Sequence, residues 1–227
     1  MRYKTGMRRP QAVIFDLDGT LIDSRGDIAA ACNFALERAG RARLSVEAIS
    51  AMVGDGARVL VARAFALPPD SKELDSPVRD FNVYYTENSA KFATYLPGAQ
   101  EAMQTLRDRG LKIALATNKP RPVTVAVMAA MDMAKYFHAV AAGGDGPLKP
   151  AADPLLRVLA ELTVAPTDAW MVGDGPQDVG AGKAAGCTTI AVGGGFAARE
   201  HVEAVGADRF LESLAELVPL IDSLANS

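Results

Sequence analysis

The stretch Gln11–Thr20, QAVIFDLDGT, decides the fold that we expect for the rest of the chain. Its first residues form an apolar run rich in Val, Ile and Phe, which predicts a short strand buried on both faces. The run ends at Asp16, and a polar segment that also contains Asp18 and Gly19 follows directly. In open α/β sheets, ligands bind beyond the carboxyl ends of the strands. This segment is therefore a candidate for a functional site.

Apolar runs of the same kind recur along the chain and alternate with helical patterns. We expect further strands at Leu111–Thr117, Phe137–Ala142, Ala169–Gly173 and Thr188–Val192. We expect helices at Pro97–Arg109, Pro122–Met133, Asp153–Leu162, Gln177–Ala185 and Ala197–Val205. Alternating strands and helices are typical of parallel βαβ units. The predicted fold class is α/β, with a Rossmann-like, doubly wound parallel sheet as its core.

The segment from about Gly26 to Lys91 interrupts this alternation. It contains no convincing strand pattern, and turn-forming residues flank it on both sides. Helical spacing is present at Asp27–Ala39, Ala57–Ala66 and Glu73–Ala90. We therefore expect an inserted all-helical cap domain, joined to the core by two links that allow hinge motion. The predicted bounds are 1–24 with 95–227 for the core and 25–94 for the cap domain.

The composition narrows the class of protein. The net charge of -3 gives no bulk attraction for nucleic acids or membranes. No apolar run approaches the roughly 20 residues that span a bilayer, and the basic segment Met1–Pro10 lacks the apolar stretch of a signal peptide. Two cysteines, Cys32 and Cys187, make no disulfide framework. We expect a cytoplasmic protein without nucleic-acid or membrane partners, and its oligomeric state stays open.

Polar and charged residues follow four strands that we expect to be neighbours in the sheet. These sets are Asp16–Thr20, Thr117–Lys119, Lys149 and Gly173–Asp178. A single Asp or Thr after a strand is often only a turn or cap residue, and this is an equal alternative for Asp174 or Thr117 taken alone. Taken together, crowded carboxylates repel unless a cation balances them. Carboxylate oxygens without His or Cys favour Mg²⁺, and a lysine and a threonine beside that ion would suit a phosphate group.

The four sets match, in order, the four motifs of the haloacid dehalogenase-like hydrolases: DLDGT, Thr117, Lys149 and GDGPQD. The chain resembles this family over nearly its whole length, and the helical insertion is similar to the family's cap domain. The resemblance implies a Mg²⁺-dependent phosphomonoester hydrolase that forms an aspartyl-phosphate intermediate. Asp16 would then be the nucleophile and Asp18 the acid and base. Asp16, Asp174 and the backbone carbonyl of Asp18 would hold Mg²⁺.

The resemblance also implies a set of phosphate ligands. Thr117, Lys149 and the amides near Asn118 and Gly19 would bind phosphoryl oxygens. Asp178 would orient Lys149 or a metal-bound water. A nearly equal alternative is that Asp178 is an acid in the first turn of a helix and only interacts with the helix dipole.

An acid at position 18 separates the subclasses of the family, because dehalogenases and phosphonate hydrolases lack it. The chain looks most like the phosphoglycolate phosphatases, on the stretches Val53–Phe65, Thr117–Pro120, Lys149–Leu156, Ala185–Cys187 and Ala207–Leu217. The implied substrate is 2-phosphoglycolate, which would yield glycolate and phosphate. The alternatives are a phosphatase for another small phosphate, such as a sugar phosphate, a nucleotide or pyrophosphate, a phosphomutase, or a catalytically silent regulatory module.

Arg58 is a candidate contact between the cap domain and the substrate carboxylate. It follows Gly54–Ala57, which could offer backbone amides at a helix start. A solvated arginine on a helix face is the more frequent case, so both interpretations stay open.

Overall fold

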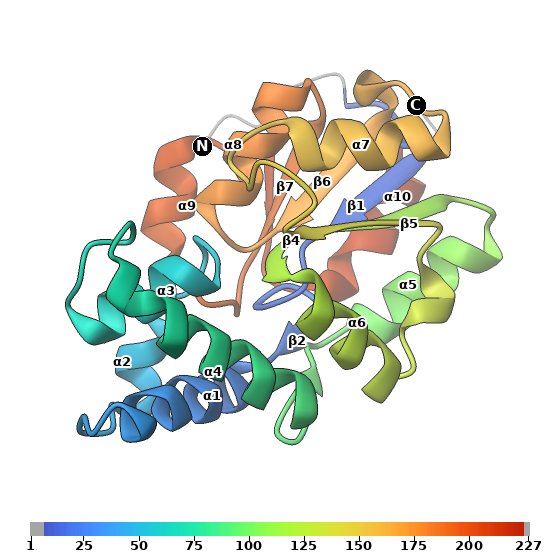
Figure 1. Ribbon diagram of the computed structural model, residues 1–227. Helices are drawn as coiled ribbons and strands as arrows, with labels where there is room; N and C mark the ends of the chain where they lie inside the picture. The colour runs from blue at the N-terminus through green and yellow to red at the C-terminus, as the bar shows by residue number, and fades with distance from the viewer. Residues whose placement is uncertain (1–6, 225–227) are drawn as a thin grey trace.

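The computed structural model describes residues 7–224, so the first six residues of Met1–Pro10 lie outside it. Its centre is a six-stranded parallel sheet in the order β5-β4-β1-β6-β7-β8 (Figure 1). The strands are β1 (Ala12–Phe15), β4 (Lys112–Pro120), β5 (Ala139–Gly143), β6 (Ala169–Gly173), β7 (Thr188–Val192) and β8 (Arg209–Leu211). The five expected strands and the α/β class are confirmed. Strand β8 was not expected, because three residues are too few for a periodic pattern.

Helices cover both faces of the sheet. In Figure 1, α7 (Asp153–Leu162) and α8 (Pro176–Ala185) lie above it, and α5 (Ala99–Asp108) and α6 (Arg121–Ala130) lie below it. Helix α9 (Arg199–Val205) packs beside α8. The five helices expected in the core are confirmed to within a few residues. Helix α10 (Leu217–Ser223), which contacts α5, was not expected.

The side chains of β1 alternate between two apolar clusters. Val13 and Phe15 belong to the larger cluster, and Ala12 and Ile14 belong to the cluster that includes residues of α7 and α8. All four are fully buried, as the continuous apolar run predicts for a strand covered on both faces. Phe15 is paired with Leu115 on one side and Val172 on the other. This register makes the segments that follow β1, β4 and β6 leave the sheet at the same edge.

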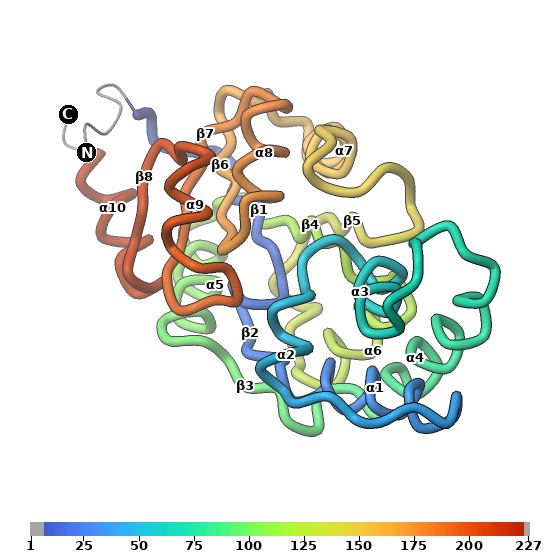
Figure 2. Tube along the Cα trace, turned by 90° about the vertical axis from the view of Figure 1, so that its left-hand side faces the viewer, coloured from blue at the N-terminus to red at the C-terminus, as the bar shows by residue number. Residues whose placement is uncertain are grey.

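A helical segment, residues 25–93, lies between two very short strands. It contains α1 (Arg25–Arg38), α2 (Val46–Ser50), α3 (Ala57–Phe65) and α4 (Asp75–Glu87) and no strand. Three of these helices were expected, and α2 was not. Figure 2 shows the four helices gathered on one side of the molecule, away from β8 and α10. The division into two domains at residues 24 and 95 stays a prediction.

The two links to the helical segment pair with each other. Strands β2 (Ile22–Asp23) and β3 (Thr94–Tyr95) form an antiparallel ladder. Two-residue strands from distant parts of the chain leave no local pattern, which is why they were not expected. Short 3₁₀ helices complete the fold at Lys72–Leu74, Ala134–Tyr136, Pro166–Asp168 and Leu214–Glu216.

Two further features bear on the expectations from composition. In the part of the chain that the structure describes, no helix has the length and apolar character needed to cross a membrane. Cys32 and Cys187 are free and buried.

Candidate active site

The motif residues meet at a cavity of about 460 Å³ between the sheet edge and the helical segment. Seven of the predicted site residues line it: Asp16, Asp18, Thr117, Asn118, Lys149, Asp174 and Asp178. Gly19 and Arg58 do not line it. The opposite wall comes from the helical segment and includes Gly54–Ala57, Arg63 and Tyr85.

Three carboxylates form the acidic centre of this cavity. One oxygen from each of Asp16, Asp174 and Asp178 lies within 4.8 Å of the others. Burial raises the pKa of Asp16 to about 7 despite the charge of Lys149, and the charges of Asp178 and Asp174 add to the increase. Burial and the charge of Asp178 raise the pKa of Asp174 to about 6. Two buried carboxylates and a partly buried one lie beside a single cation and lack balancing positive charge, so the site fits a hard divalent cation such as Mg²⁺.

Lys149 is the cation inside this acidic centre. Its Nζ lies 2.8 Å from Oδ1 of Asp16 and 2.6 Å from Oδ1 of Asp178. Burial alone would lower the pKa of Lys149, but the charges of the two carboxylates outweigh it and raise the pKa to about 12. Oδ2 of Asp178 accepts a hydrogen bond from the amide of Gly175 at 2.9 Å. Asp178 therefore pairs with Lys149 and also accepts an amide at the start of α8, so both roles considered for it stay predictions.

Asp174 is held between two glycines. Thr20 Oγ1 donates to its Oδ1 at 2.9 Å, and the amide of Phe196 donates to its Oδ2 at 2.7 Å. A Cβ atom on Gly19, at φ +82°, would come within 2.4 Å of this carboxylate, and a Cβ on Gly195 within 2.3 Å. Only residues without a side chain allow this approach.

The amides near Gly19 stay predicted donors to phosphate, but the amide of Gly19 itself has another partner. Its amide donates to the carbonyl of Ile22 at 2.8 Å. Gly19 contributes space for Asp174 instead.

Asn118 ties three segments together. Its Nδ2 donates to the carbonyls of Gly54 and Lys149, both at 2.9 Å, and its Oδ1 accepts from the amide of Lys149 at 2.8 Å. The Asn118 side chain thus positions the Lys149 backbone and holds the helical segment against the sheet edge.

Thr117 Oγ1 accepts from the amide of Lys119 at 3.2 Å, which leaves its hydroxyl hydrogen able to donate into the cavity.

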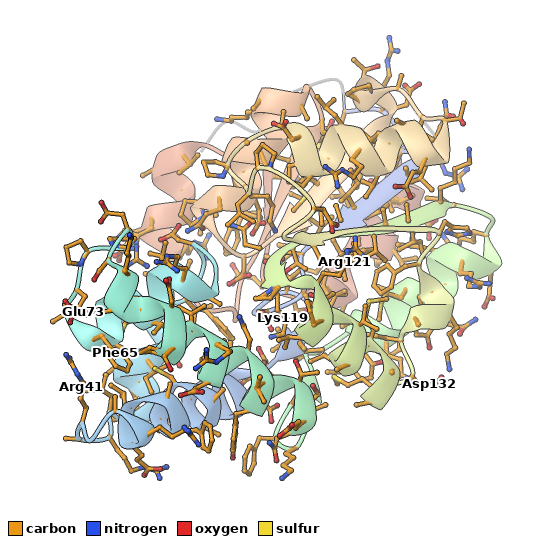
Figure 3. All side chains as sticks on the ribbon, in the orientation of Figure 1. Arg41, Phe65, Glu73, Lys119, Arg121 and Asp132 are labelled. Carbon is orange, nitrogen blue, oxygen red and sulfur yellow. The ribbon has the colours of Figure 1, made fainter. Side chains whose placement is uncertain are left out.

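The sequence reasoning missed the surroundings of Asp18. Ser24 Oγ donates to Oδ1 of Asp18 at 2.5 Å, and Lys119 Nζ lies 2.9 and 3.0 Å from its two carboxylate oxygens. Lys119 Nζ also donates to the hydroxyl of Tyr85, on α4, at 2.6 Å. Figure 3 labels Lys119 at the junction of the sheet and the helical segment. The stretch Thr117–Pro120 was the available signal for Lys119, whereas Tyr85 and Ser24 gave none.

The structure places Arg58 away from the cavity. Its guanidinium donates to the carbonyls of Pro69 and Ser71 and to Asp75, so it stabilises the start of α4. The arginine that lines the cavity is Arg63, whose Nη2 lies 2.5 Å from Oδ2 of Asp55. Of the two interpretations of Arg58, this geometry favours the arginine on a helix face, because its contacts with residues 69–75 hold it away from the cavity.

Magnesium binding should strengthen as the pH rises. Asp16 and Asp174 must both be ionised to bind the cation, and their pKa values of about 7 and 6 mean that protons compete below neutrality. We expect the Mg²⁺ affinity to rise about tenfold or more from pH 5.5 to 7.5, measured by calorimetry. The variant Asp174→Asn should bind Mg²⁺ weakly at both pH values, and an affinity that does not change with pH would contradict the assignment of these ligands.

The same pKa shifts determine how stability depends on pH without metal. Because the folded pKa values lie above that of a free aspartate, the stabilising contribution of these two groups is complete below about pH 4 and is lost as the pH rises through 6 to 7. Mg²⁺ should therefore raise the thermal midpoint more at pH 8 than at pH 5.

Three comparisons with known proteins point to one family. A family model described as haloacid dehalogenase-like hydrolase matches residues 13–192. A phosphoglycolate phosphatase of Chromobacterium violaceum is 37% identical over 221 residues, which cover 95% of this chain and 98% of that protein. The crystal structure of a predicted phosphoglycolate phosphatase from Haemophilus somnus 129PT has a TM-score of 0.86 and 26% identity, with 95% of this chain and 99% of that chain covered.

A structure with a bound ligand is also similar. CbbY from Rhodobacter sphaeroides, in complex with phosphate, has a TM-score of 0.79 and 26% identity, with 92% of this chain and 96% of that chain covered. The family model covers well over half of the chain and includes all four motifs. The chain therefore belongs to the haloacid dehalogenase-like hydrolases and, within them, to the phosphoglycolate phosphatase family of phosphoric monoester hydrolases.

Proposed function

We propose that the chain is a Mg²⁺-dependent phosphatase that forms an aspartyl-phosphate on Asp16, and that its substrate is 2-phosphoglycolate. The observation that carries the mechanism is the position of Asp16, which lines the cavity with its carboxylate in contact with the ammonium of Lys149 and close to the carboxylates of Asp174 and Asp178. A carboxylate with only a structural role would need neither a buried cation beside it nor two further carboxylates in the same cavity.

In the first step, a carboxylate oxygen of Asp16 attacks phosphorus and the bond to the leaving oxygen breaks. Lys149 opposes the effect of burial on the pKa of Asp16, which favours the ionised nucleophile, and it can pair with a phosphoryl oxygen. Thr117 donates its hydroxyl hydrogen to another phosphoryl oxygen. Asp18, oriented by Ser24 and Lys119, gives a proton to the leaving alcohol.

In the second step, Asp18 takes a proton from a water molecule that attacks the phosphorus of the aspartyl-phosphate. The acyl-phosphate bond breaks, inorganic phosphate leaves, and the carboxylate of Asp16 is restored. Held by Asp16, Asp174 and the carbonyl of Asp18, Mg²⁺ would screen the repulsion between carboxylate and phosphate and offset the charge that develops.

The substrate proposal rests on the relatives and on the small cavity. The relatives that carry the phosphoglycolate phosphatase name align over almost their whole length. The cavity of about 460 Å³ is bounded by the helical segment, which favours a small ester over a polymer. Small phosphorylated metabolites are accordingly the proposed partners, and the cytoplasm is the proposed location.

Phosphate release from a panel of esters tests this proposal. The panel contains 2-phosphoglycolate, a sugar phosphate, a nucleotide, pyrophosphate and an aryl phosphate, each with Mg²⁺ and with EDTA. We expect 2-phosphoglycolate to have the highest kcat/KM and EDTA to abolish release. A different best ester would leave the mechanism standing and refute the substrate. If no ester is hydrolysed, the catalytically silent module becomes the better explanation.

A further inference from the structure

We propose that Lys119 binds an acidic group on the leaving alcohol and thereby selects phosphate esters of small hydroxy acids. This inference rests on the proposed function, because it locates the leaving group beside Asp18. It assigns the role that was sought in Arg58 to a residue of the sheet edge.

The chemistry of the leaving group determines where a cation that binds its carboxylate must lie. Asp18 must lie within hydrogen-bond reach of the leaving oxygen to protonate it. In glycolate, only one carbon separates that oxygen from the carboxylate. A cation that binds this carboxylate must therefore lie next to Asp18, and Lys119 Nζ lies 2.9 and 3.0 Å from the two Asp18 oxygens.

The other strong cations of the cavity are less suited to this role. Within residues 7–224, the lysines and arginines that line the cavity besides Lys119 are Lys149 and Arg63. Lys149 is held between Asp16 and Asp178, where the phosphoryl group would bind. Arg63 is paired with Asp55 at 2.5 Å, and its side chain is 44% exposed. Solvent screens the charge of such an exposed arginine, so it offers little to a substrate carboxylate.

The surroundings of Lys119 strengthen an ion pair. Its side chain is 3% exposed, and its Nζ lies 4.0 Å from the centre of the Tyr85 ring. Apolar side chains of the helical segment, Ile28, Leu60 and Phe81, line the same cavity. A charge pair in such a poorly hydrated place is less screened by solvent than one at the surface.

The contacts of Lys119 leave a way for a substrate to bind. Its ammonium donates to both oxygens of Asp18 and to the hydroxyl of Tyr85. One contact is enough to orient Asp18, so a second donor can turn to the substrate carboxylate. Burial raises the pKa of Tyr85 well above its usual value, helped by the charges of Asp18 and Asp27. The tyrosine thus keeps a hydroxyl hydrogen, which can donate to the same carboxylate while its oxygen accepts from Lys119.

Two matched esters test the inference. 2-Phosphoglycolate has a carboxylate where 2-hydroxyethyl phosphate has a neutral hydroxymethyl group. The ratio of their kcat/KM values therefore measures how much the negative charge of the leaving group contributes to selectivity. We expect the native chain to prefer 2-phosphoglycolate strongly. In Lys119→Met this ratio should fall on the order of 10- to 100-fold, as expected for the loss of a hydrogen bond between charged groups.

Control variants separate this role from others. Lys119→Gln keeps a hydrogen-bond donor without the charge, and its ratio should fall as well. Arg63→Met removes an exposed cation that lines the same cavity, and its ratio should stay near the native value. Thermal unfolding shows which variants are folded, and the ratio for the native chain is informative even if neither Lys119 variant folds.

Three results would overturn the inference. The first is a native ratio near one. The second is an equal loss on both esters in the Lys119 variants, which would make Lys119 only a positioning residue for Asp18. The third is a large fall of the ratio in Arg63→Met, which would mean that Arg63 binds the substrate carboxylate. Failure of the native chain to release phosphate from any ester with Mg²⁺ would instead refute the proposed function, and the inference with it.

Discussion

Replacing Asp16 by asparagine should abolish phosphate release from every ester that the native chain hydrolyses, by about 10⁴-fold or more. The amide has nearly the shape of the carboxylate but is a poor nucleophile, and it cannot form an acyl-phosphate that water then hydrolyses. Steady-state phosphate release measures the loss. Trapping of a phosphorylated protein with acid should succeed for the native chain and fail for Asp16→Asn.

The control for this variant is the same chemical change at an acid far from the cavity. Asp132 lies beyond the end of α6, its side chain is 83% exposed, and Figure 3 labels it away from the site. Asp132→Asn should keep the native turnover. Asp16→Asn should unfold at a thermal midpoint no lower than the native one at pH 8, because it removes one of three crowded acids. Turnover above about one hundredth of native in pure Asp16→Asn would exclude Asp16 as the nucleophile.

Replacing Lys149 by methionine should damage both activity and stability. The Lys149 side chain is 2% exposed, and its ammonium lies 2.8 Å from Asp16 and 2.6 Å from Asp178. Its removal leaves buried carboxylates without their cation, which costs about 3–5 kcal/mol of unfolding free energy in comparable pairs. Activity should fall about 10²-fold or more, since a phosphoryl ligand is lost together with the orientation of the nucleophile. Denaturant unfolding at pH 7.5 in EDTA measures the loss of stability.

Two comparisons decide whether the loss comes from unpaired charge. The double variant Lys149→Met with Asp178→Asn removes one acid with the cation, so it should recover part of the stability but none of the activity. Lys135→Met breaks an exposed pair with Asp132 and should leave stability close to native. If Lys149→Met were as stable as Lys135→Met, the description of a tightly balanced buried cluster would be wrong.

The sequence alone predicted the sheet and most of the helices. Continuous apolar runs such as residues 12–15 identify strands covered on both faces, and this pattern requires no knowledge of their partners. Polar residues directly after those runs were brought together as expected, because carboxyl ends of parallel strands meet at one edge. Asp16, Thr117 and Asp174 reach one cavity for this reason, and the loop after β5 brings Lys149 to the same cavity. The elements β2, β3, β8, α2 and α10 were missed, because these short segments carry neither a continuous apolar run nor a clear helical periodicity.

The tertiary structure decided which side chains surround the acid–base residue and which ones face the substrate. Lys119 contacts Asp18 and Tyr85 only because the helical segment packs against the sheet edge. The same packing turns Arg63 toward the cavity and Arg58 away from it. Local sequence determines whether a residue lies in a helix or at the end of a strand. Contacts between residues far apart in the chain depend on how the helical segment folds back over the sheet, and no local pattern encodes that.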